Sequence, residues 1–245
     1  MEQAEYELMA TVEDRMWWYH GLHTLAAERF VAARGKAPLP VLPALDGGCG
    51  TGGLLTRLST AAPDATLVGI EYAPPAAAMA RAKSGRGIVI GTVNSLPFAD
   101  AAFGAMFSMD VLCHRAVDED RALAEAHRCL APGGVLIVNL PAYRWMLSSH
   151  DTRVHNVRRY TRREVVDMLG RAGFARVWAS YWNTLLFPMM VLKRKLLGGE
   201  ASDVHPFPAP VEFLFRSVLA IERAVLALGL RFPFGGSILA VAVKP

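Results

Sequence analysis

The stretch that most constrains this chain is residues 45–53, which read LDGGCGTGG: an apolar run ends on an acid and opens into five glycines. The apolar run begins at Val41, and a helical pattern begins at Leu54. Glycine adopts positive φ freely and lets the backbone approach a ligand without a Cβ in the way. A helix N-terminus behind such a turn offers unpaired N–H groups. The stretch therefore predicts a strand, a glycine turn and a helix that together form a ligand-binding site.

The composition is apolar for a chain of 245 residues, with 53% hydrophobic residues and a mean hydropathy of +0.26. A membrane-spanning helix needs roughly 18 apolar residues in succession, and the run 185–192 is stopped by the basic residues 193–195. The acidic residues 1–5 lack the features of a signal peptide, and the three cysteines do not have the spacing of a zinc site. We therefore expect one decorated domain in the reducing cytoplasm, and the net charge of +4 indicates no nucleic-acid partner.

Strand and helix patterns alternate along most of the chain. Apolar runs predict strands at 41–45, 66–71, 87–91, 103–109, 135–140, 174–182 and 236–243. Helical patterns lie between them at 52–61, 74–83, 119–130 and 161–173. The last helix opens on a capping box from Thr161 to Glu164. This alternation predicts an α/β fold with a doubly wound, mostly parallel sheet and helices on both faces.

Two segments beside this alternation carry aromatic or charged clusters. Residues 7–34 are predicted to form one helix with the sequence MWWYH (16–20) at its centre. These aromatics either dock the helix on the domain or provide one wall of a ligand pocket. Residues 141–160 are too irregular for an assignment and contain much of an arginine-rich stretch, 153–163. Such a stretch is either a solvated face or a binding site for an anion.

An insertion over 184–230 separates the last two predicted strands. Its second helix, 211–228, keeps Glu212, Arg216 and Arg223 on one narrow face and is apolar elsewhere. Insertions of this length usually carry a function. We divide the chain into a helical cap (1–40), a main domain (41–183 with 231–245) and this insertion, which we expect to be a lid, a dimer surface or a peripheral membrane contact.

The glycines alone leave two ligands open. The pattern Gly48-x-Gly50-x-x-Gly53 satisfies the dinucleotide fingerprint. However, Asp46 stands just before the glycines, where it would repel a pyrophosphate. A nicotinamide dinucleotide is therefore the weaker alternative.

The remaining landmarks resemble those of class I S-adenosylmethionine (SAM) dependent methyltransferases, the broad group that includes quinone- and lipid-type enzymes. The matching stretches, in order and spacing, are 45–52, 68–72, 96–103, 109–114 and 130–136. The resemblance implies a seven-stranded sheet of order 3-2-1-4-5-7-6 whose last strand is antiparallel. It also implies SAM as cofactor, S-adenosylhomocysteine as product, and no metal.

The resemblance assigns cofactor contacts to positions around the glycine turn and at the ends of the next strands. Glu71 is expected to accept both ribose hydroxyls, and Asp110 to lie beside the reacting methyl group. Tyr72 is expected on the adenine face, with Val93 and Asn94 nearby. The full set is Asp46, Gly48, Cys49, Gly50, Gly52, Glu71, Tyr72, Val93, Asn94 and Asp110.

The residues that bind or activate the acceptor are harder to predict, since methyl transfer needs a base only when the acceptor carries a proton. The candidate bases are His114, His150 and His155. His114 could equally be a packing residue, and the pair His150-Asp151 is either an acid–base couple or a loop cap. The candidate acceptor contacts are Trp18, Tyr19, Tyr143, Arg159 and Tyr160.

The sequence thus predicts a SAM-dependent methyltransferase that acts on a small, hydrophobic acceptor, with an anionic acceptor left open and O-, N- or C-methylation undetermined. A non-catalytic SAM-binding protein is the alternative from another class, and a NAD-dependent oxidoreductase ranks below it. We expect a monomer or a homodimer.

Overall fold

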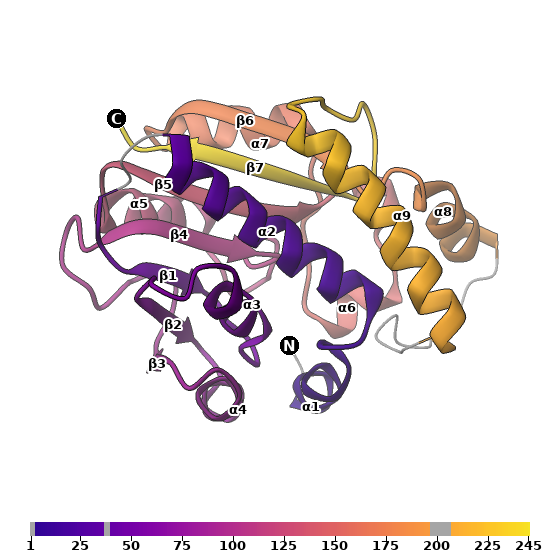
Figure 1. The fold of residues 1–245 in the computed structure, drawn as a ribbon, viewed down its shortest axis with the longest axis horizontal. Helices are drawn as coiled ribbons and strands as arrows, with labels where there is room; N and C mark the ends of the chain where they lie inside the picture. Colours follow the sequence, from indigo (N-terminus) through magenta and orange to yellow (C-terminus); the bar gives the residue numbers. More distant parts are fainter. Residues whose placement is uncertain (1–2, 37–39, 197–206) are drawn as a thin grey trace.

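The computed structural model describes residues 3–36, 40–196 and 207–245, which build one seven-stranded sheet with helices on both faces (Figure 1). The strands are β1 Ala44–Gly47, β2 Leu67–Glu71, β3 Gly87–Ile90, β4 Phe103–Met109, β5 Leu130–Pro141, β6 Ala175–Trp182 and β7 Ser237–Val243. Their order in the sheet is β3-β2-β1-β4-β5-β7-β6, and β7 runs antiparallel to both of its neighbours. The predicted strand order and the antiparallel last strand are therefore confirmed.

The sheet is apolar on both faces, as a parallel sheet covered by helices must be. Along β5, Val135 and Ile137 pack into one core cluster, and Leu136 and Val138 pack into the other. This division follows the two-residue period of a strand. The two clusters hold the helices on opposite sides of the sheet.

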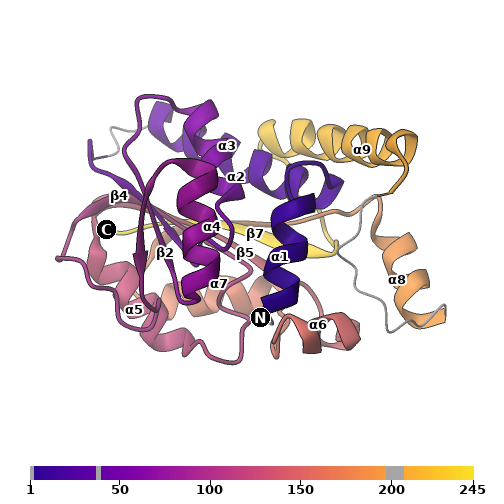
Figure 2. The same ribbon diagram turned by 90° about the horizontal axis from the view of Figure 1, so that it is seen from below.

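The helices form the outer layers (Figure 2). The helices on one side are α2 Trp17–Lys36, α3 Gly53–Ala61, α4 Pro74–Ser84 and α9 Ala209–Ala227, and those on the other side are α5 Glu119–Cys129 and α7 Arg162–Arg171. The capping box that opens α7 is present: the Thr161 N–H donates to Glu164 Oε2 at 2.7 Å, and the Glu164 N–H donates to Thr161 Oγ1 at 3.3 Å.

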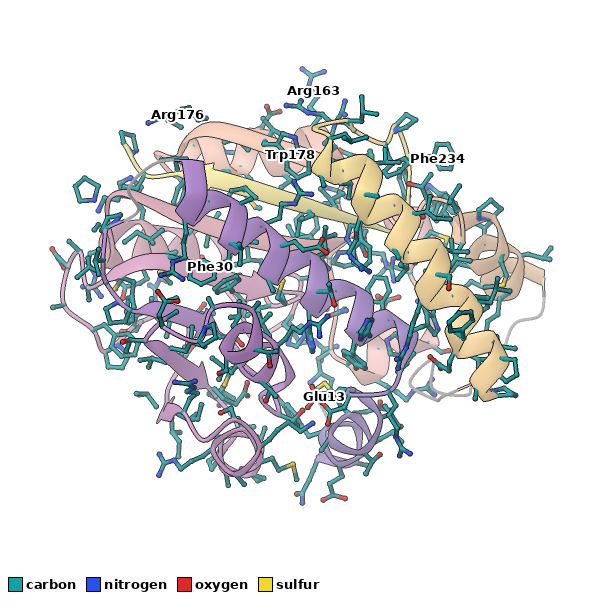
Figure 3. All side chains as sticks on the ribbon, in the orientation of Figure 1. Glu13, Phe30, Arg163, Arg176, Trp178 and Phe234 are labelled. Atoms are coloured by element: carbon teal, nitrogen blue, oxygen red, sulfur yellow. The ribbon has the colours of Figure 1, made fainter. Side chains whose placement is uncertain are left out.

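The prediction of a single helix over 7–34 was wrong. The structure has two helices, α1 Gln3–Val12 and α2 Trp17–Lys36, with Glu13 at their junction (Figure 3). Glu13 turns toward the glycine turn, where its carboxylate accepts a hydrogen bond from the Thr51 hydroxyl at 2.5 Å. The Trp17 N–H donates to the Glu212 carboxylate at 2.6 Å, which stabilises the start of α2 as a helix cap does. Trp17 and Trp18 therefore begin a helix and do not lie at its centre.

Other boundaries also differ from the predicted ones. The first strand begins at Ala44, because Val41 is fully exposed ahead of it. Strand β5 begins five residues early, at Leu130, which pairs with Phe103 before a register shift. The segment that carried no assignment contains a 3₁₀ turn (η1, Arg144–Met146) and α6 Ser149–Arg153, and the insertion adds α8 Phe187–Leu196. Within the described residues, no helix is long and apolar enough to cross a membrane.

Candidate active site

A cavity of about 1350 Å³ lies at the carboxyl ends of the central strands. Pockets for single drug-sized ligands usually measure about 300–1,000 Å³, so this cavity has room for two molecules. Its lining comes from the glycine turn, the ends of β2 and β4, helices α1, α2, α6 and α8, and the inner side of α9. The position agrees with the general rule that open α/β sheets bind ligands outside the carboxyl ends of their strands.

The glycine turn has the backbone conformation that its sequence predicts. Gly48, Gly50 and Gly52 have φ angles of +82°, +54° and +91°. A Cβ on Gly52 would lie 2.9 Å from Ala80 Cα, which leaves no room for a side chain against α4. Gly48, Cys49 and Gly50 line the cavity, whereas Gly52 is not among the lining residues. Gly52 therefore packs the turn, and its neighbours face the ligand.

Glu71, at the end of β2, forms hydrogen bonds to the glycine turn and to the residues that follow β2. Its carboxylate accepts the N–H groups of Gly50 and Ala73, each at 3.0 Å, and the hydroxyl of Tyr6 at 3.1 Å. A carboxylate has about four acceptor positions, so three of them are taken. One further hydroxyl can bind directly, and a second must displace Tyr6.

Asp46 is buried at the floor of the cavity, with 2% of its surface exposed. Its Oδ2 atom has no hydrogen-bond partner among the described residues. Burial raises the pKa of Asp46 to about 8, and the neighbouring Glu71 and Glu13 add to this rise. A buried carboxyl oxygen without a partner needs a donor, and a cationic ligand would supply one.

Helix α1 covers this end of the cavity with Tyr6, Met9 and Glu13, three residues that sequence reasoning missed. The Lys83 ammonium lies 2.6 Å from Glu13 Oε1 and fastens the end of α1 to α4. The acidic pair at 13–14, placed inside a predicted helix, was the one local signal of a break there.

Asp110, at the end of β4, lies at the centre of a chain of contacts. Its φ angle is +55°, a strained conformation for a residue other than glycine. Asn139 Nδ2 donates to Asp110 Oδ1 at 2.9 Å, and Trp182 Nε1 donates to Asn139 Oδ1 at 2.7 Å. The Trp182 ring stacks on the Trp18 ring, with the ring centroids 4.8 Å apart. Burial raises the pKa of Asp110 to about 7.

Two residues predicted to contact adenine, Tyr72 and Asn94, differ in whether their side chains are available to a ligand. Tyr72 is 74% exposed at the edge of the cavity and can move to cover a ligand. Asn94 also lines the cavity, but its side chain donates to the Ala116 carbonyl at 2.9 Å and accepts the Asp118 N–H at 3.0 Å. Val93 lines the same region.

The three candidate bases all line the cavity: His114, His150 and His155. Burial lowers the pKa of His114 to about 4, with smaller effects from the chain's N-terminal charge and from His155. His114 is therefore neutral at physiological pH. Asp151, which follows His150, caps α6 by accepting the Ser148 N–H at 2.9 Å, which favours the loop-capping alternative for this acid.

The predicted acceptor contacts divide into two groups. Trp18, Tyr19 and Arg159 line the cavity, whereas Tyr143 and Tyr160 are not among its lining residues. The Tyr160 hydroxyl donates to Glu119 at 2.7 Å. The Tyr143 ring stacks on the Tyr181 ring, with the ring centroids 5.3 Å apart.

The guanidinium group of Arg159 makes its hydrogen bonds within the protein. Its Nη2 atom lies 2.9 and 3.0 Å from the two carboxylate oxygens of Asp151, and its Nη1 atom donates to the Ala142 carbonyl at 3.0 Å. Both side chains of the pair are at most 5% exposed. The pair therefore fixes the segment over the cavity, and Arg159 has little capacity left for an anionic ligand.

The end of the cavity away from the glycine turn is mostly apolar, although Lys193 and Arg194 of α8 also line the cavity. Its walls are Trp17 and Trp18 from α2, Met189, Met190 and Leu192 from α8, and Phe207 and Phe215 at α9. One cavity thus joins an acidic end to an apolar end.

Comparison with known proteins identifies the class to which this site belongs. A methyltransferase domain family matches residues 45–138. A malonyl-[acyl-carrier protein] O-methyltransferase of Herminiimonas arsenicoxydans is 33% identical over 185 residues, which are 71% of this chain and 70% of that protein. The chain belongs to the class I SAM-dependent methyltransferases.

Two further relatives agree with this assignment. A demethylmenaquinone methyltransferase of Thermus thermophilus is 40% identical over 108 residues, which cover 42% of this chain and about half (47%) of that protein's length. A crystal structure of a SAM-dependent methyltransferase from Thermotoga maritima, a possible histamine N-methyltransferase, aligns over 99% of this chain and 95% of its own. Its TM-score is 0.62 at 21% identity, which shows a shared fold.

The residues present suit the cofactor of this class. SAM carries an ammonium and a sulfonium group and has no phosphate. Glu13 and Glu71 give one end of the cavity a negative potential, which attracts such a cation and repels a pyrophosphate, and Asp46 adds to it once a bound cation lowers its pKa. The dinucleotide alternative therefore fits this site poorly. The described residues include no group of three His, Cys, Asp or Glu side chains arranged to hold a metal ion.

Proposed function

We propose that this methyltransferase transfers the methyl group of SAM to a small, hydrophobic acceptor. The observation that carries the proposal is the single cavity with an acidic, glycine-lined end and an apolar end. One relative described above is named for demethylmenaquinone, a quinone, and this supports a small acceptor with an apolar part, whereas the other is named for an acid carried on a protein. We expect the enzyme to work in the cytoplasm, where its three buried cysteines stay reduced.

In this proposal the cofactor lies along the glycine turn. Glu71 binds the ribose, and the unpartnered oxygen of Asp46 faces the ammonium group. Tyr72 and Val93 cover the adenine. The methyl group then points past Asp110 toward the apolar chamber.

Transfer is an in-line displacement in which the sulfonium charge disperses, so a dry, apolar chamber favours it. Holding the two reactants in line can contribute about 7–11 kcal/mol in well-oriented cases. A general base near pH 7 needs a pKa near that value. Asp110, which lines the cavity, has this property. An anionic acceptor would have to bind without Arg159, which Asp151 occupies.

Methyl-labelled SAM tests the proposal. The purified enzyme is incubated with labelled SAM and an organic extract of cells, and the products are separated into organic-soluble, water-soluble and macromolecular fractions. We expect the label in the organic-soluble fraction. Label confined to protein or RNA, or no transfer above that of a Glu71→Gln variant, would contradict a small hydrophobic acceptor.

The pKa of Asp46 predicts how SAM binding depends on pH. Asp46 is protonated in the free enzyme below about pH 8. A bound cation lowers this pKa, so binding releases a proton and the affinity rises with pH, by up to about tenfold per unit between about pH 6 and 7.5. Titration calorimetry in buffers of different ionisation enthalpy measures the proton release. The isosteric Asp46→Asn variant should show weaker, pH-independent binding, and the same pH dependence in both proteins would refute this role.

A further inference from the structure

The polarity of α9 is inverted for a helix on the outside of a domain. Its two carboxylates are buried: Glu212 is 8% exposed and accepts the Trp17 N–H, and Glu222 is 1% exposed and accepts the Leu185 N–H at 2.8 Å. Arg223 also points inward and lies 3.0 Å from Glu28 on α2. A surface helix normally turns its charges to water. Here they join α9 to the rest of the protein.

The outer surface of α9 is apolar as a consequence. The exposed fractions are 73% for Phe213, 56% for Leu214, 59% for Ile221 and 80% for Leu228. Their spacing places them along one side of the helix. Leu230, which is 57% exposed, extends the surface beyond the helix end. These five residues form what we call the apolar face. A contiguous face of this kind marks an interaction site, whereas single exposed apolar residues do not.

The apolar face lies at the end of the molecule where α8 opens onto the cavity. Met189 and Leu192 on α8 are 42% and 52% exposed, and both also line the cavity. Helices α8 and α9 lie at the same end of the molecule in both views (Figures 1 and 2). Phe234, labelled beside them in Figure 3, contacts Phe187 at the start of α8 with ring centroids 6.2 Å apart. At this end of the molecule, exposed apolar side chains of α8 thus lead from the surface into the chamber.

The charges around the face select the partner. Of the charged side chains described between 184 and 236, those that reach solvent are all basic, with Lys193 and Arg231 exposed. The carboxylates that the structure describes in this region, Glu212 and Glu222, are buried. A two-fold contact with a second copy would bring basic groups together without an exposed carboxylate of this described region to pair them. A bilayer with anionic lipids offers both apolar depth and negative charge.

We propose that the apolar face docks this methyltransferase on anionic membrane surfaces, and that its acceptor is a lipid-phase molecule that enters the cavity beside α8. The acceptor route rests on the proposed function, whereas the docking itself does not. Docking is therefore measured without SAM and without turnover.

Vesicle co-sedimentation of the full chain tests the docking. We expect the wild-type protein to bind phosphatidylcholine vesicles that contain phosphatidylserine, more weakly in high salt, and to bind pure phosphatidylcholine poorly. The variant Phe213→Ser/Leu214→Ser/Ile221→Ser should bind at least about tenfold more weakly. The matched control is Ile90→Ser, a residue that is 60% exposed on β3 at the other edge of the sheet, and it should bind like the wild type.

Separate readouts distinguish the possible failures. The triple variant should keep its thermal unfolding temperature and its affinity for S-adenosylhomocysteine, because the exchanged side chains are exposed. No binding to anionic vesicles by the wild type, or equal binding by the triple variant, would overturn the proposal. So would a concentration-dependent dimer that the triple substitution dissolves, since a second copy would then cover the face. Absent methyl transfer with intact vesicle binding would instead count against the proposed function alone.

Discussion

Replacing Glu71 with glutamine is expected to weaken the binding of SAM and of S-adenosylhomocysteine by about tenfold to a hundredfold. Hydrogen bonds to a charged group contribute about 1.5–3 kcal/mol each, and at least one such bond to the ribose would be lost. Gly50 and Ala73 donate to different oxygens of the carboxylate, so the amide would also point its N–H₂ group at one of these two N–H donors. The contact between the glycine turn and the loop after β2 would then weaken. Titration calorimetry with S-adenosylhomocysteine measures the effect.

Tyr6→Phe is the matched control for this substitution. It removes one neutral donor from the same carboxylate and leaves the charge and the two N–H contacts in place. A ligand hydroxyl can take the acceptor position that Tyr6 leaves on the carboxylate, so the affinity should change by at most about tenfold in either direction. Glu71→Gln binding that equals wild-type binding, in a protein that is folded by circular dichroism, would show that Glu71 does not hold the cofactor.

Arg159→Met is expected to lower the free energy of unfolding by about 3–5 kcal/mol, the largest stability effect that the structure predicts. Breaking a buried ion pair costs this much because the remaining charge stays buried without its partner. Here the remaining charge is Asp151, which is 1% exposed and keeps only the longer contact of 3.9 Å with Arg194 among the described ion pairs, so the lower end of this range is expected. The segment 141–160 should loosen over the acceptor end of the cavity. Urea unfolding followed by fluorescence gives the free-energy difference.

Two further variants separate the buried charge from other causes. Arg163→Met removes a side chain that is 93% exposed and should change the unfolding free energy by less than about 0.5 kcal/mol. The double variant Asp151→Asn/Arg159→Met keeps an oxygen that can cap α6 but removes the carboxylate charge, so it should be more stable than Arg159→Met. Equal stabilities of the single and double variants would mean that the uncompensated charge is not the cause.

The sheet was predictable from the sequence because its signals are local. Strand β4 occupies 103–109 as predicted, since a strand buried on both faces is a continuous apolar run bounded by polar residues. The glycine turn was predictable for a similar reason: a φ angle of +91° at Gly52 against α4 admits no other residue without strain. The positions of Glu71 and Asp110 at the cavity were predictable because both residues lie at the carboxyl ends of predicted strands.

The covering of the site was not predictable, because contacts between distant residues decide it. The break between α1 and α2 depends on Glu13 meeting Thr51, and on Glu212 meeting Trp17, which is 195 residues away in the chain. The sequence grouped Glu212, Arg216 and Arg223 on one narrow face of a helix correctly. Periodicity cannot say which side of a helix faces the domain when an apolar surface remains outside.

A crystal structure of the full chain with bound S-adenosylhomocysteine tests the central claim most directly, namely that one cavity binds the cofactor at its acidic end and the acceptor at its apolar end. We predict electron density with a ribose hydroxyl on Glu71, the amino group at Asp46 Oδ2, and the sulfur facing the chamber that Trp18 and Met190 line. Density with the ribose away from Glu71, or with the sulfur closed off from that chamber, would contradict it.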